Sequence, residues 1–338
     1  MKAAVLKSIG NIEELKINLT IEDFPIPEIT NNEILINVKY ASINHRDVWI
    51  TKGLYSRIKL PVILGSDCSG IIHSKGSDVT EFNIGDEVII NPGLNWGTDE
   101  NFQSKEFKIL GMPDNGTFAE YLKIDKAYLY KKPGHLSFEE ASAIPLTGIT
   151  AYCSVFKKAG INKDDNVLIT GIGGGVASAA LVFAKSAGAK VFVTSGSDEK
   201  ISKAISIGAE GGVNYTKKNW DKDIIALAEN KIDVVIDGTG GDTFLKCIDI
   251  INYGGRIISY GSTAGNVMNF PLARIFWKQL KIFGSTMGSP ANFVRMIKYI
   301  NDNKLEFVVD SVLSLENIAD AFERMASGKQ FGKIVIKI

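Results

Sequence analysis

The sequence is poor in cysteine and has no long apolar run. Its three cysteines, Cys68, Cys153 and Cys247, lie far apart and form no Cys-x-x-Cys pair, which argues against a disulfide framework and against a thiolate metal site. No apolar stretch approaches the ~18 residues that a membrane span requires. The N-terminal segment meets Glu13 and Glu14 early, unlike a secretion signal. We therefore expect a cytoplasmic protein.

The chain also has no excess of charge of either sign. Lys and Arg together number 38, and Asp and Glu together number 38, so there is no net basic field to attract nucleic acid or anionic lipid. We expect neither as a partner. Hydrophobic residues make up 45% of the 338 positions, which is enough for two domains that each have a core.

Glycine, in contrast, is plentiful and is concentrated in one stretch. A short β-branched run, Val167–Thr170, is followed by five residues of which four are glycine, and then by the helix formers of 176–187. Gly188 stands where that helix should end, and Lys190–Thr194 is a second apolar strand. The order strand, tight turn, helix and strand is typical of a βαβ unit that binds a dinucleotide.

Such a turn has a physical purpose. Glycines let the backbone approach a pyrophosphate, and the free N–H groups at the start of the helix hold its charge. The spacing here is not the strict form, because Ala177 stands where a third glycine is usual and one residue is inserted. A glycine-rich turn can also close an ordinary α/β unit that binds no ligand, so the turn alone does not decide the function.

The rest of this region repeats the pattern of helix and strand. Gly, Ser or Thr follows the strands, as in a doubly wound parallel sheet whose ligand crevice lies along the carboxyl ends of the strands. The expected elements are helix 199–207, strand 212–215, helix 220–230, strand 233–237, a helix after Gly238, Gly240 and Gly241, strand 256–260 and strand 280–283.

The N-terminal third has a different pattern, with short strands separated by Gly, Pro and Asn turns, and indicates an all-β module. The C-terminal part has two helices, 293–303 and 315–327, and the strand 333–337. This is too little sheet to stand alone, so we expect it to return to the first module. The expected strands of that module are 3–6, 33–40, 68–73, 87–91 and 119–123.

The order of these parts resembles the medium-chain dehydrogenase/reductase superfamily over nearly the full chain, near the zinc-type alcohol dehydrogenase-like and quinone oxidoreductase branches. The resemblance implies an α/β fold with a Rossmann doubly wound parallel sheet at 147–288, and a GroES-like β-rich domain formed by 1–146 and 289–338. It also implies a cleft between them and hydride transfer from a nicotinamide cofactor. The segments that carry it are Ile43–Gly53, Leu60–Gly70, Ile144–Tyr152, Phe276–Ser289 and Gln330–Lys337.

The sequence departs from the zinc enzymes of that family at the metal positions. The resemblance places Asn44, Ser66 and Leu146 where two cysteines and a histidine hold the catalytic zinc, and an amide, a hydroxyl and an alkyl group cannot replace them. The loop that holds a second zinc in those enzymes matches 91–111, which contains no cysteine. We expect no metal at either place. The carboxylates Asp67, Asp99, Glu100 and Glu106 are expected to belong to solvated surface and not to a cation site.

Loss of zinc favours reduction of a conjugated double bond or a quinone, because oxidation of an alcohol needs a group that lowers the pKa of its hydroxyl. The resemblance implies Asn44 as a catalytic donor beside the nicotinamide ribose, with Asp47 steadying its loop. His45 tends to contact the pyrophosphate in the family, although a surface imidazole is an equal alternative. Arg46 is expected in a surface ion pair, and Trp49 and Tyr55 as walls of the cleft or as simple core.

Cofactor choice depends on the end of the second strand. An NAD enzyme usually has Asp or Glu there, about 20 residues past the glycine turn, whereas this chain has Ser195, and Lys200 follows one turn later. We therefore expect NADP(H), with Asp198 as the N-cap of the next helix. The full set of expected cofactor contacts is Asn44, His45, Thr150, Gly173, Gly174, Gly175, Val176, Ser195, Lys200, Tyr215, Thr239, Gly261, Ser262, Gly332 and Lys333.

The sequence thus predicts a zinc-independent, NADP(H)-dependent oxidoreductase that transfers hydride to quinones, enones or related carbonyl compounds. Two alternatives stay open at this stage: a metal-free alcohol or aldehyde dehydrogenase, and a nucleotide-binding protein without turnover. The resemblance also implies a homodimer that joins through the strand 256–260 and the apolar segment 276–283.

Overall fold

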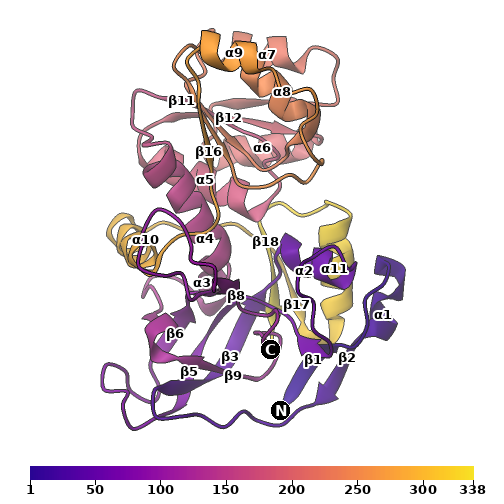
Figure 1. Ribbon diagram of the computed structural model, residues 1–338, viewed down its shortest axis with the longest axis vertical. Coiled ribbons are helices and arrows are strands. Elements are labelled where there is room, and N and C mark those ends of the chain that lie inside the picture. Colours follow the sequence, from indigo (N-terminus) through magenta and orange to yellow (C-terminus); the bar gives the residue numbers. More distant parts are fainter. The chain divides into compact units, whose positions relative to one another are not determined.

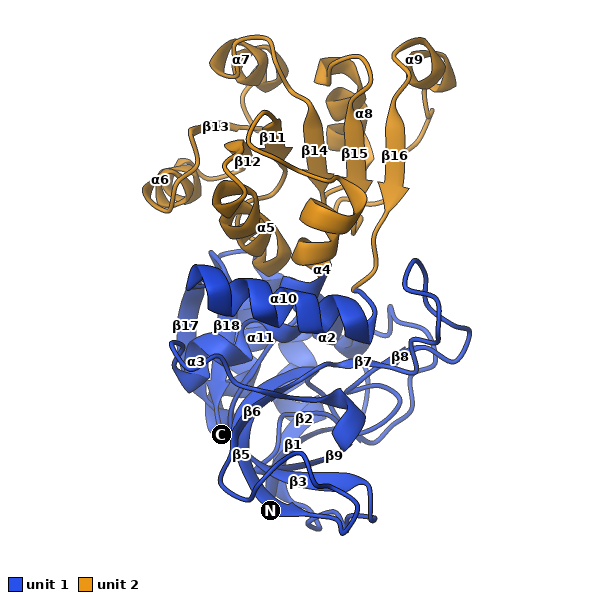
Figure 2. Ribbon diagram, turned by 90° about the vertical axis from the view of Figure 1, so that its left-hand side faces the viewer, with its two compact units in different colours: residues 1–149, 288–338 blue, residues 150–287 orange.

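The computed structural model describes residues 1–338 and divides into two compact units, which Figure 2 shows in different colours. Unit 1 comprises Met1–Ile149 and Gly288–Ile338, and unit 2 comprises Thr150–Met287. The exact domain limits expected from the sequence, 146/147 and 288/289, stay a prediction.

Unit 1 is built on a seven-stranded sheet in which the strand order is β10-β6-β5-β3-β18-β17, with β9 paired to β3. The long strand β3 (Glu33–Ser42) organises this sheet because it pairs antiparallel with β5, β9 and β18. Alternate side chains of β3, those of Ile34, Ile36 and Val38, are buried in the core. That period of two is typical of a strand with one face against a core.

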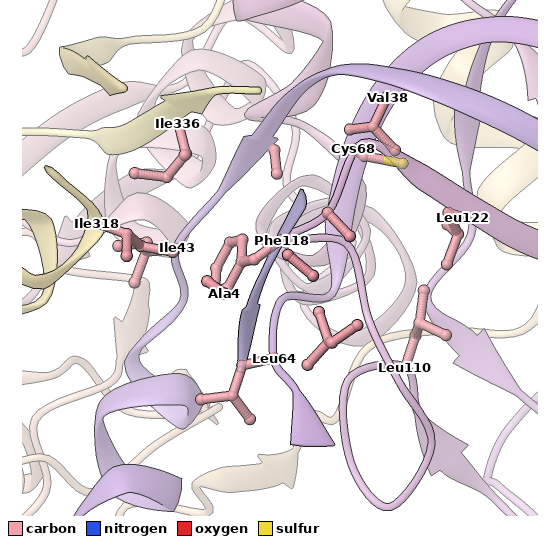
Figure 3. Close-up of a cluster of buried hydrophobic side chains, with 14 of the residues drawn as sticks. Ala4, Val38, Ile43, Leu64, Cys68, Leu110, Phe118, Leu122, Ile318 and Ile336 are labelled. Carbon is pink, nitrogen blue, oxygen red and sulfur yellow. The ribbon is translucent and has the colours of Figure 1, made fainter. Parts of the chain in front are cut away.

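The C-terminal segment completes the sheet of unit 1, as expected from the sequence. Strand β18 (Lys333–Lys337) pairs antiparallel with β3, Val335 opposite Ser42. Figure 3 shows Ile336 and Ile318, both from this segment, in the same apolar cluster as Phe118 and Ile43. Burial of these side chains therefore ties residues more than 200 positions apart into one core.

Two small sheets, β2-β1-β4 and β7-β8, complete unit 1, and its elements follow the chain as labelled in Figure 1. The other strands are β1 (Lys2–Leu6), β2 (Leu19–Asp23), β4 (Val62–Ile63), β5 (Asp67–Lys75), β6 (Glu87–Ile90), β7 (Gly93–Leu94), β8 (Lys108–Ile109), β9 (Tyr121–Asp125), β10 (Leu129–Lys131) and β17 (Val309–Ser314). The helices are α1 (Leu15–Asn18), α2 (His45–Thr51), α3 (Phe138–Ser142), α10 (Pro290–Asn303) and α11 (Ile318–Ala326), with 3₁₀ turns η1 (Ile12–Glu14), η2 (Lys126–Tyr128) and η4 (Leu315–Asn317).

Unit 2 is a six-stranded sheet in the order β13-β12-β11-β14-β15-β16, and every neighbouring pair is parallel. Numbered within the unit, this is the order 3-2-1-4-5-6 of a doubly wound dinucleotide-binding fold. The Rossmann fold expected from the sequence is confirmed. The strands are β11 (Asn166–Ile169), β12 (Lys190–Ser195), β13 (Gly211–Asn214), β14 (Val234–Asp237), β15 (Arg256–Ser259) and β16 (Lys281–Gly284).

Helices connect these parallel strands. They are α5 (Gly175–Ser186), α6 (Asp198–Ser206), α7 (Trp220–Leu227), α8 (Gly241–Ile250) and α9 (Leu272–Trp277). Helix α4 (Pro145–Tyr152) and the π-helix η3 (Cys153–Lys158) carry the chain from unit 1 into unit 2. None of these helices combines the length and the apolar character that a membrane crossing needs. The three cysteines are free and buried.

Candidate active site

The glycine turn lies between β11 and α5 of unit 2, as the sequence predicts. Gly171 has φ of 62°, a left-handed conformation that favours glycine. The first helical hydrogen bond is that from Ser178 N–H to the Gly174 carbonyl, so the N–H groups of Gly175, Val176 and the next residue precede the bonded part of the helix. Free N–H groups at the start of a helix are the donors that hold a pyrophosphate.

The other expected cofactor residues of unit 2 follow the carboxyl ends of the parallel strands. Thr239 comes after β14, where its hydroxyl donates to Thr170 Oγ1 at 3.1 Å and its N–H donates to Asp237 Oδ1 at 3.2 Å. Burial raises the pKa of Asp237, although Thr170 and two backbone N–H groups bind its carboxylate. Gly261 and Ser262 follow β15. Strand topology therefore brings these residues to one edge of the sheet.

The end of β12 differs in one detail from the sequence prediction. Helix α6 begins at Asp198, and its N-cap is Ser197, whose side chain accepts a hydrogen bond from Lys200 N–H. The expectation that Asp198 caps this helix is wrong. Asp198 Oδ1 instead accepts from Asn214 Nδ2 at 3.1 Å and lies 3.4 Å from Lys217 Nζ. Ser and Asp are equally good N-caps, so the sequence could not separate two adjacent candidates.

In unit 1, the predicted residue Asn44 stands at the start of helix α2. It is the N-cap in extended conformation, and its N–H donates to Asp47 Oδ2 at 2.8 Å. Asp47 lies three residues into the helix, so its carboxylate returns to the cap as in a capping box. Both side chains are buried. This local contact holds the backbone of the two predicted catalytic residues.

A buried carboxylate, Asp67, joins Asn44 to two other parts of unit 1. Asp67 Oδ2 accepts from Asn44 Nδ2 at 2.9 Å and from Lys333 Nζ at 3.0 Å. Its second oxygen accepts from the backbone N–H of Leu146 at 2.8 Å. Asp67 is fully buried, so the expectation that it belongs to a solvated surface is wrong.

Lys333 fixes the orientation of the Asn44 amide. Its ammonium donates to Asn44 Oδ1 at 2.7 Å, to the Ile43 carbonyl at 2.9 Å and to Asp67 Oδ2, which uses its three donors. Because Lys333 can only donate, Oδ1 of Asn44 must face it and Nδ2 must face Asp67. The second N–H of that amide has no acceptor among residues 1–338.

Arg46 is not in a surface ion pair, and the expectation that it would be is wrong. Its side chain is 8% exposed. Nη1 donates to Ser66 Oγ at 2.7 Å and to the Leu110 carbonyl at 2.9 Å. Its guanidinium carbon lies 5.0 Å from the centre of the Tyr55 ring, a cation–π contact.

Asp47 is the least satisfied member of this group. Burial raises its pKa to about 6, although the neighbouring charges of Arg46 and Lys333 lower it. Its Oδ1 accepts no hydrogen bond, and the nearest guanidinium nitrogen, Arg46 Nη1, is 3.8 Å away. A buried carboxylate without full hydrogen bonding is destabilised in its charged form.

Three further predicted residues have the following surroundings, each within its own unit. His45 is exposed and its ring meets Trp49 edge-on, with ring centres 5.7 Å apart. Gly332 has φ of 101°, and a Cβ there would lie 2.4 Å from the Val308 carbonyl oxygen, so only glycine fits before Lys333. Thr150 is the first residue of unit 2 and is buried in α4.

The residues at the zinc positions do not fit a zinc ion. Asn44, Ser66 and Leu146 supply an amide, a hydroxyl and an alkyl group, and Zn²⁺ prefers thiolate, imidazole or carboxylate. Two cationic groups, the Lys333 ammonium and the Arg46 guanidinium, are hydrogen-bonded to Asn44 and Ser66, and they would repel a divalent cation. Among residues 1–338, no group of three or more His, Cys, Asp and Glu side chains could hold a metal ion.

Comparison with known proteins agrees with this architecture. A model of the alcohol dehydrogenase GroES-like domain matches residues 30–134, and a model of zinc-binding dehydrogenases matches 175–302. The chain is 34% identical to zinc-type alcohol dehydrogenase-like protein YogA of Leptosphaeria maculans over 96% of this chain and 94% of that protein. The chain belongs to the medium-chain dehydrogenase/reductase superfamily.

Two further members show the range of the superfamily. Acryloyl-coenzyme A reductase of Sulfurisphaera tokodaii is 32% identical over 94% of this chain and 96% of that protein. A crystal structure of an NAD-dependent alcohol dehydrogenase is 39% identical, with a TM-score of 0.94 and full coverage of both chains. The chain is therefore an oxidoreductase of the medium-chain type, and members of this superfamily use nicotinamide cofactors.

Sequence reasoning missed the environment of three residues in this site. The sequence indicates only that Ser66 stands at a lost zinc position, that Asp67 belongs to a solvated surface and that Arg46 is in a surface ion pair. Each bonds to a group that is 20 or more residues away in sequence. The one usable signal is the pair of charged residues, Arg46 and Asp47, two and three positions after Asn44 at the start of a helix.

Proposed function

We propose that this oxidoreductase is zinc-independent and transfers hydride to enones, quinones or related carbonyl compounds. The observation that supports this most is the Asn44 amide, which Lys333 and Asp67 orient with one N–H left for a ligand. A donor held in this way suits an oxygen that gains negative charge during the reaction, because it needs no reorganisation at that moment.

Different residues of the chain have different roles in this hydride transfer. A bound reduced nicotinamide supplies the hydride. Asn44 donates its free N–H to the substrate oxygen, and Lys333 holds Asn44 by a charge-assisted hydrogen bond. Asp67 balances the charge of Lys333 at 3.0 Å, and Asp47 holds the Asn44 backbone at the start of α2. The carboxylates of this set, Asp47 and Asp67, already accept hydrogen bonds from Asn44, and we assign neither as the base that an alcohol would need.

The test is turnover with a panel of quinones, enones and aldehydes, followed by the variant Asn44→Ala. We expect an enone or a quinone to be reduced, and a loss of kcat/KM of roughly 10²-fold in the variant. Val294→Ala, at an exposed position of α10, is the matched control and should match the wild type. Turnover of alcohols alone would support the metal-free alcohol dehydrogenase instead. Unchanged kcat/KM in Asn44→Ala would show that Asn44 is only a loop residue.

NADP(H) is the proposed cofactor. Strand β12 ends in the small residue Ser195, with Lys200 in the first turn of the next helix and Tyr215 after β13. The neighbouring carboxylate, Asp198, bonds to Asn214 and to the cation of Lys217. A lysine and hydroxyl groups near this strand end suit a 2′-phosphate. The solved alcohol dehydrogenase at 39% identity is named NAD-dependent, so cofactor choice needs a direct titration.

Fluorescence titration with NADPH and NADH gives that measurement. We expect tighter binding of NADPH, and Lys200→Ala should weaken NADPH at least about tenfold, or ~1.4 kcal/mol, while NADH changes little. Lys203→Ala, one turn later and exposed, is the control. Equal binding of both cofactors by the wild type would overturn the assignment, as would a lysine variant that loses both alike.

A homodimer is the proposed assembly. Strand β16 lies at the edge of the parallel sheet of unit 2, and the preceding helix α9 exposes large apolar side chains, with Phe276 at 69% and Trp277 at 72%. An open edge with exposed apolar groups suits pairing with a second sheet. Sedimentation should show a dimer that Ile282→Asp, within β16, converts to a monomer.

A further inference from the structure

We propose that Arg46 is a second catalytic donor, which binds the carbonyl oxygen of an α,β-unsaturated carbonyl substrate as that oxygen becomes an enolate. This inference rests on the proposed reductase function and names its substrate class. Guanidinium is always protonated in proteins and cannot take a proton from an alcohol, so Arg46 favours substrates that gain charge on oxygen.

The first support is that Arg46 carries a buried charge with no carboxylate hydrogen-bonded to it. Its partners are neutral: Ser66 Oγ, the Leu110 carbonyl, the Ile109 carbonyl at 3.5 Å and the Tyr55 hydroxyl at 3.4 Å. The nearest carboxylate oxygen is 3.8 Å away. Buried charges in proteins are usually paired and hydrogen-bonded. The pair of Arg46 with Asp47 lacks that hydrogen bond, so the guanidinium keeps donor capacity for a second anion.

The second support is the count of its donors. Guanidinium has five N–H groups, and the two on Nη1 are used at 2.7 and 2.9 Å. Nη2 makes only one long contact, 3.5 Å to the Ile109 carbonyl, so its second N–H has no acceptor among residues 1–338. The well-bonded Nη1 anchors the group, and Nη2 is left for a ligand.

The third support is the position of Arg46 relative to Asn44. Asn44 bonds to Asp67 and Arg46 bonds to Ser66, which are consecutive residues where the chain enters β5. Asn44 and Arg46 are themselves two residues apart at the start of α2. Each of the two has an N–H without an acceptor. One short stretch of chain therefore carries both a neutral and a cationic donor.

The reaction balances with these groups. Hydride from the reduced nicotinamide forms a C–H bond at the β-carbon, and the π electrons of the carbon–carbon double bond shift to join the α-carbon to the carbonyl carbon. The carbonyl π pair moves to the oxygen, which Arg46 and Asn44 stabilise as an enolate. A proton from water then forms the C–H bond at the α-carbon and restores the carbonyl. The cofactor leaves oxidised.

The test compares Arg46→Gln and Arg46→Lys with the wild type, using 2-cyclohexen-1-one and saturating cofactor. We expect Arg46→Gln to lower kcat/KM by roughly 10²- to 10³-fold, mostly in kcat, and Arg46→Lys to restore part of it. The affinity for cofactor should not change. Arg295→Gln, which loses an exposed pair with Glu100, is the matched control and should keep wild-type rates.

A second measurement separates failure of this inference from failure of the proposed function. Benzoate, a carboxylate that imitates the anionic oxygen, should bind the wild type and bind Arg46→Gln at least about tenfold more weakly by calorimetry. If the wild type reduces enones and Arg46→Gln matches it, the role of Arg46 is overturned while the reductase function stands. If no enone or quinone is reduced, the proposed function fails. Equal benzoate binding by the wild type and by Arg46→Gln would overturn the anion site, whatever the outcome of the turnover assay.

Arg46→Gln leaves Asp47 with less charge compensation and could unfold the protein. Ser66→Ala is then the alternative, because it removes one acceptor of Nη1 and leaves the Leu110 carbonyl in place. We expect about a tenfold loss of kcat/KM for this variant, measured below its melting temperature so that the protein is folded. Wild-type kcat/KM in a folded Ser66→Ala protein would contradict the proposed anchoring of Arg46.

Discussion

The family resemblance aligns two regions of unit 1 with the metal sites of zinc-containing members, and the chain fills these regions differently. Around Asn44 and Ser66 it places buried charges, with Lys333 and Arg46 as cations. The loop 91–111 instead holds Trp96, which is buried and meets Phe107 edge-on at 5.3 Å. Buried charge is expensive to desolvate, whereas aromatic packing is not. We infer that the first region is kept for chemistry and the second for stability.

The loop is also closed by polar contacts that need no metal. The Trp96 indole N–H donates to the Asp99 carbonyl at 2.9 Å, and Ser104 donates from its N–H and its hydroxyl to the carbonyls of Trp96 and Asn95. Glu100 pairs with Arg295 of helix α10 at the surface. None of these groups is a buried charge, which is what separates this loop from the region around Asn44.

The largest expected effect on stability comes from removing one buried cation from the region around Asn44. Lys333→Met should cost about 3 to 5 kcal/mol in the free energy of unfolding, because it leaves Asp67 buried and uncompensated. Urea denaturation measures this change. The double variant Lys333→Met with Asp67→Leu should lose less than the sum of the single changes. Lys298→Met, at an exposed pair with Asp302, is the control and should change stability by less than about 0.5 kcal/mol.

The second prediction concerns the loop. Trp96→Ala should lower the free energy of unfolding by about 3 kcal/mol. This is the low end of the range for a buried aromatic side chain, because the loop can partly relax. Its kcat/KM should stay within about twofold of the wild type, measured where the variant is folded. A large loss of kcat/KM at unchanged stability would contradict the assignment of this loop to stability.

The third prediction is a pH dependence centred on Asp47. Its pKa is about 6 in the folded protein against 3.8 for the ordinary side chain, so its contribution to stability is full below pH 4 and is lost as pH rises through 6. The difference in unfolding free energy, Asp47→Asn minus wild type, should therefore rise by about 2 to 3 kcal/mol from pH 4 to pH 7. A flat difference would show that the charges of Arg46 and Lys333 fully offset the effect of burial on this pKa.

The smallest expected effect is at the surface of the loop. Glu100→Gln breaks its pair with Arg295, which is about half exposed on both sides, and such pairs contribute less than about 1 kcal/mol. The melting temperature of Glu100→Gln should be slightly below that of the wild type in low salt, and the difference between the two proteins should be smaller in high salt. A loss of 2 kcal/mol or more would mean that this ion pair, and not the packing of Trp96, holds the loop.

The parts of this molecule that sequence reasoning predicted are those with a local signal. The glycine turn and each strand and helix of the alternation follow from patterns within about ten residues, and the return of the C-terminal strand follows from a segment with too little sheet to stand alone. The surroundings of Arg46 and Lys333 could not be predicted, because their partners, such as Leu110 and Asn44, lie 64 and 289 positions away. Nothing in the neighbouring residues indicates whether a long cation turns inward or outward.

The central claim is that buried side chains of unit 1, and not a metal ion, stabilise the substrate oxygen during the reaction. The most direct test is kcat/KM for enone reduction before and after exhaustive treatment with a chelator, with elemental analysis of the same samples. The account predicts the same kcat/KM and melting temperature, and no stoichiometric zinc in either sample. About one zinc per chain, with activity that disappears on chelation and returns with Zn²⁺, would contradict it.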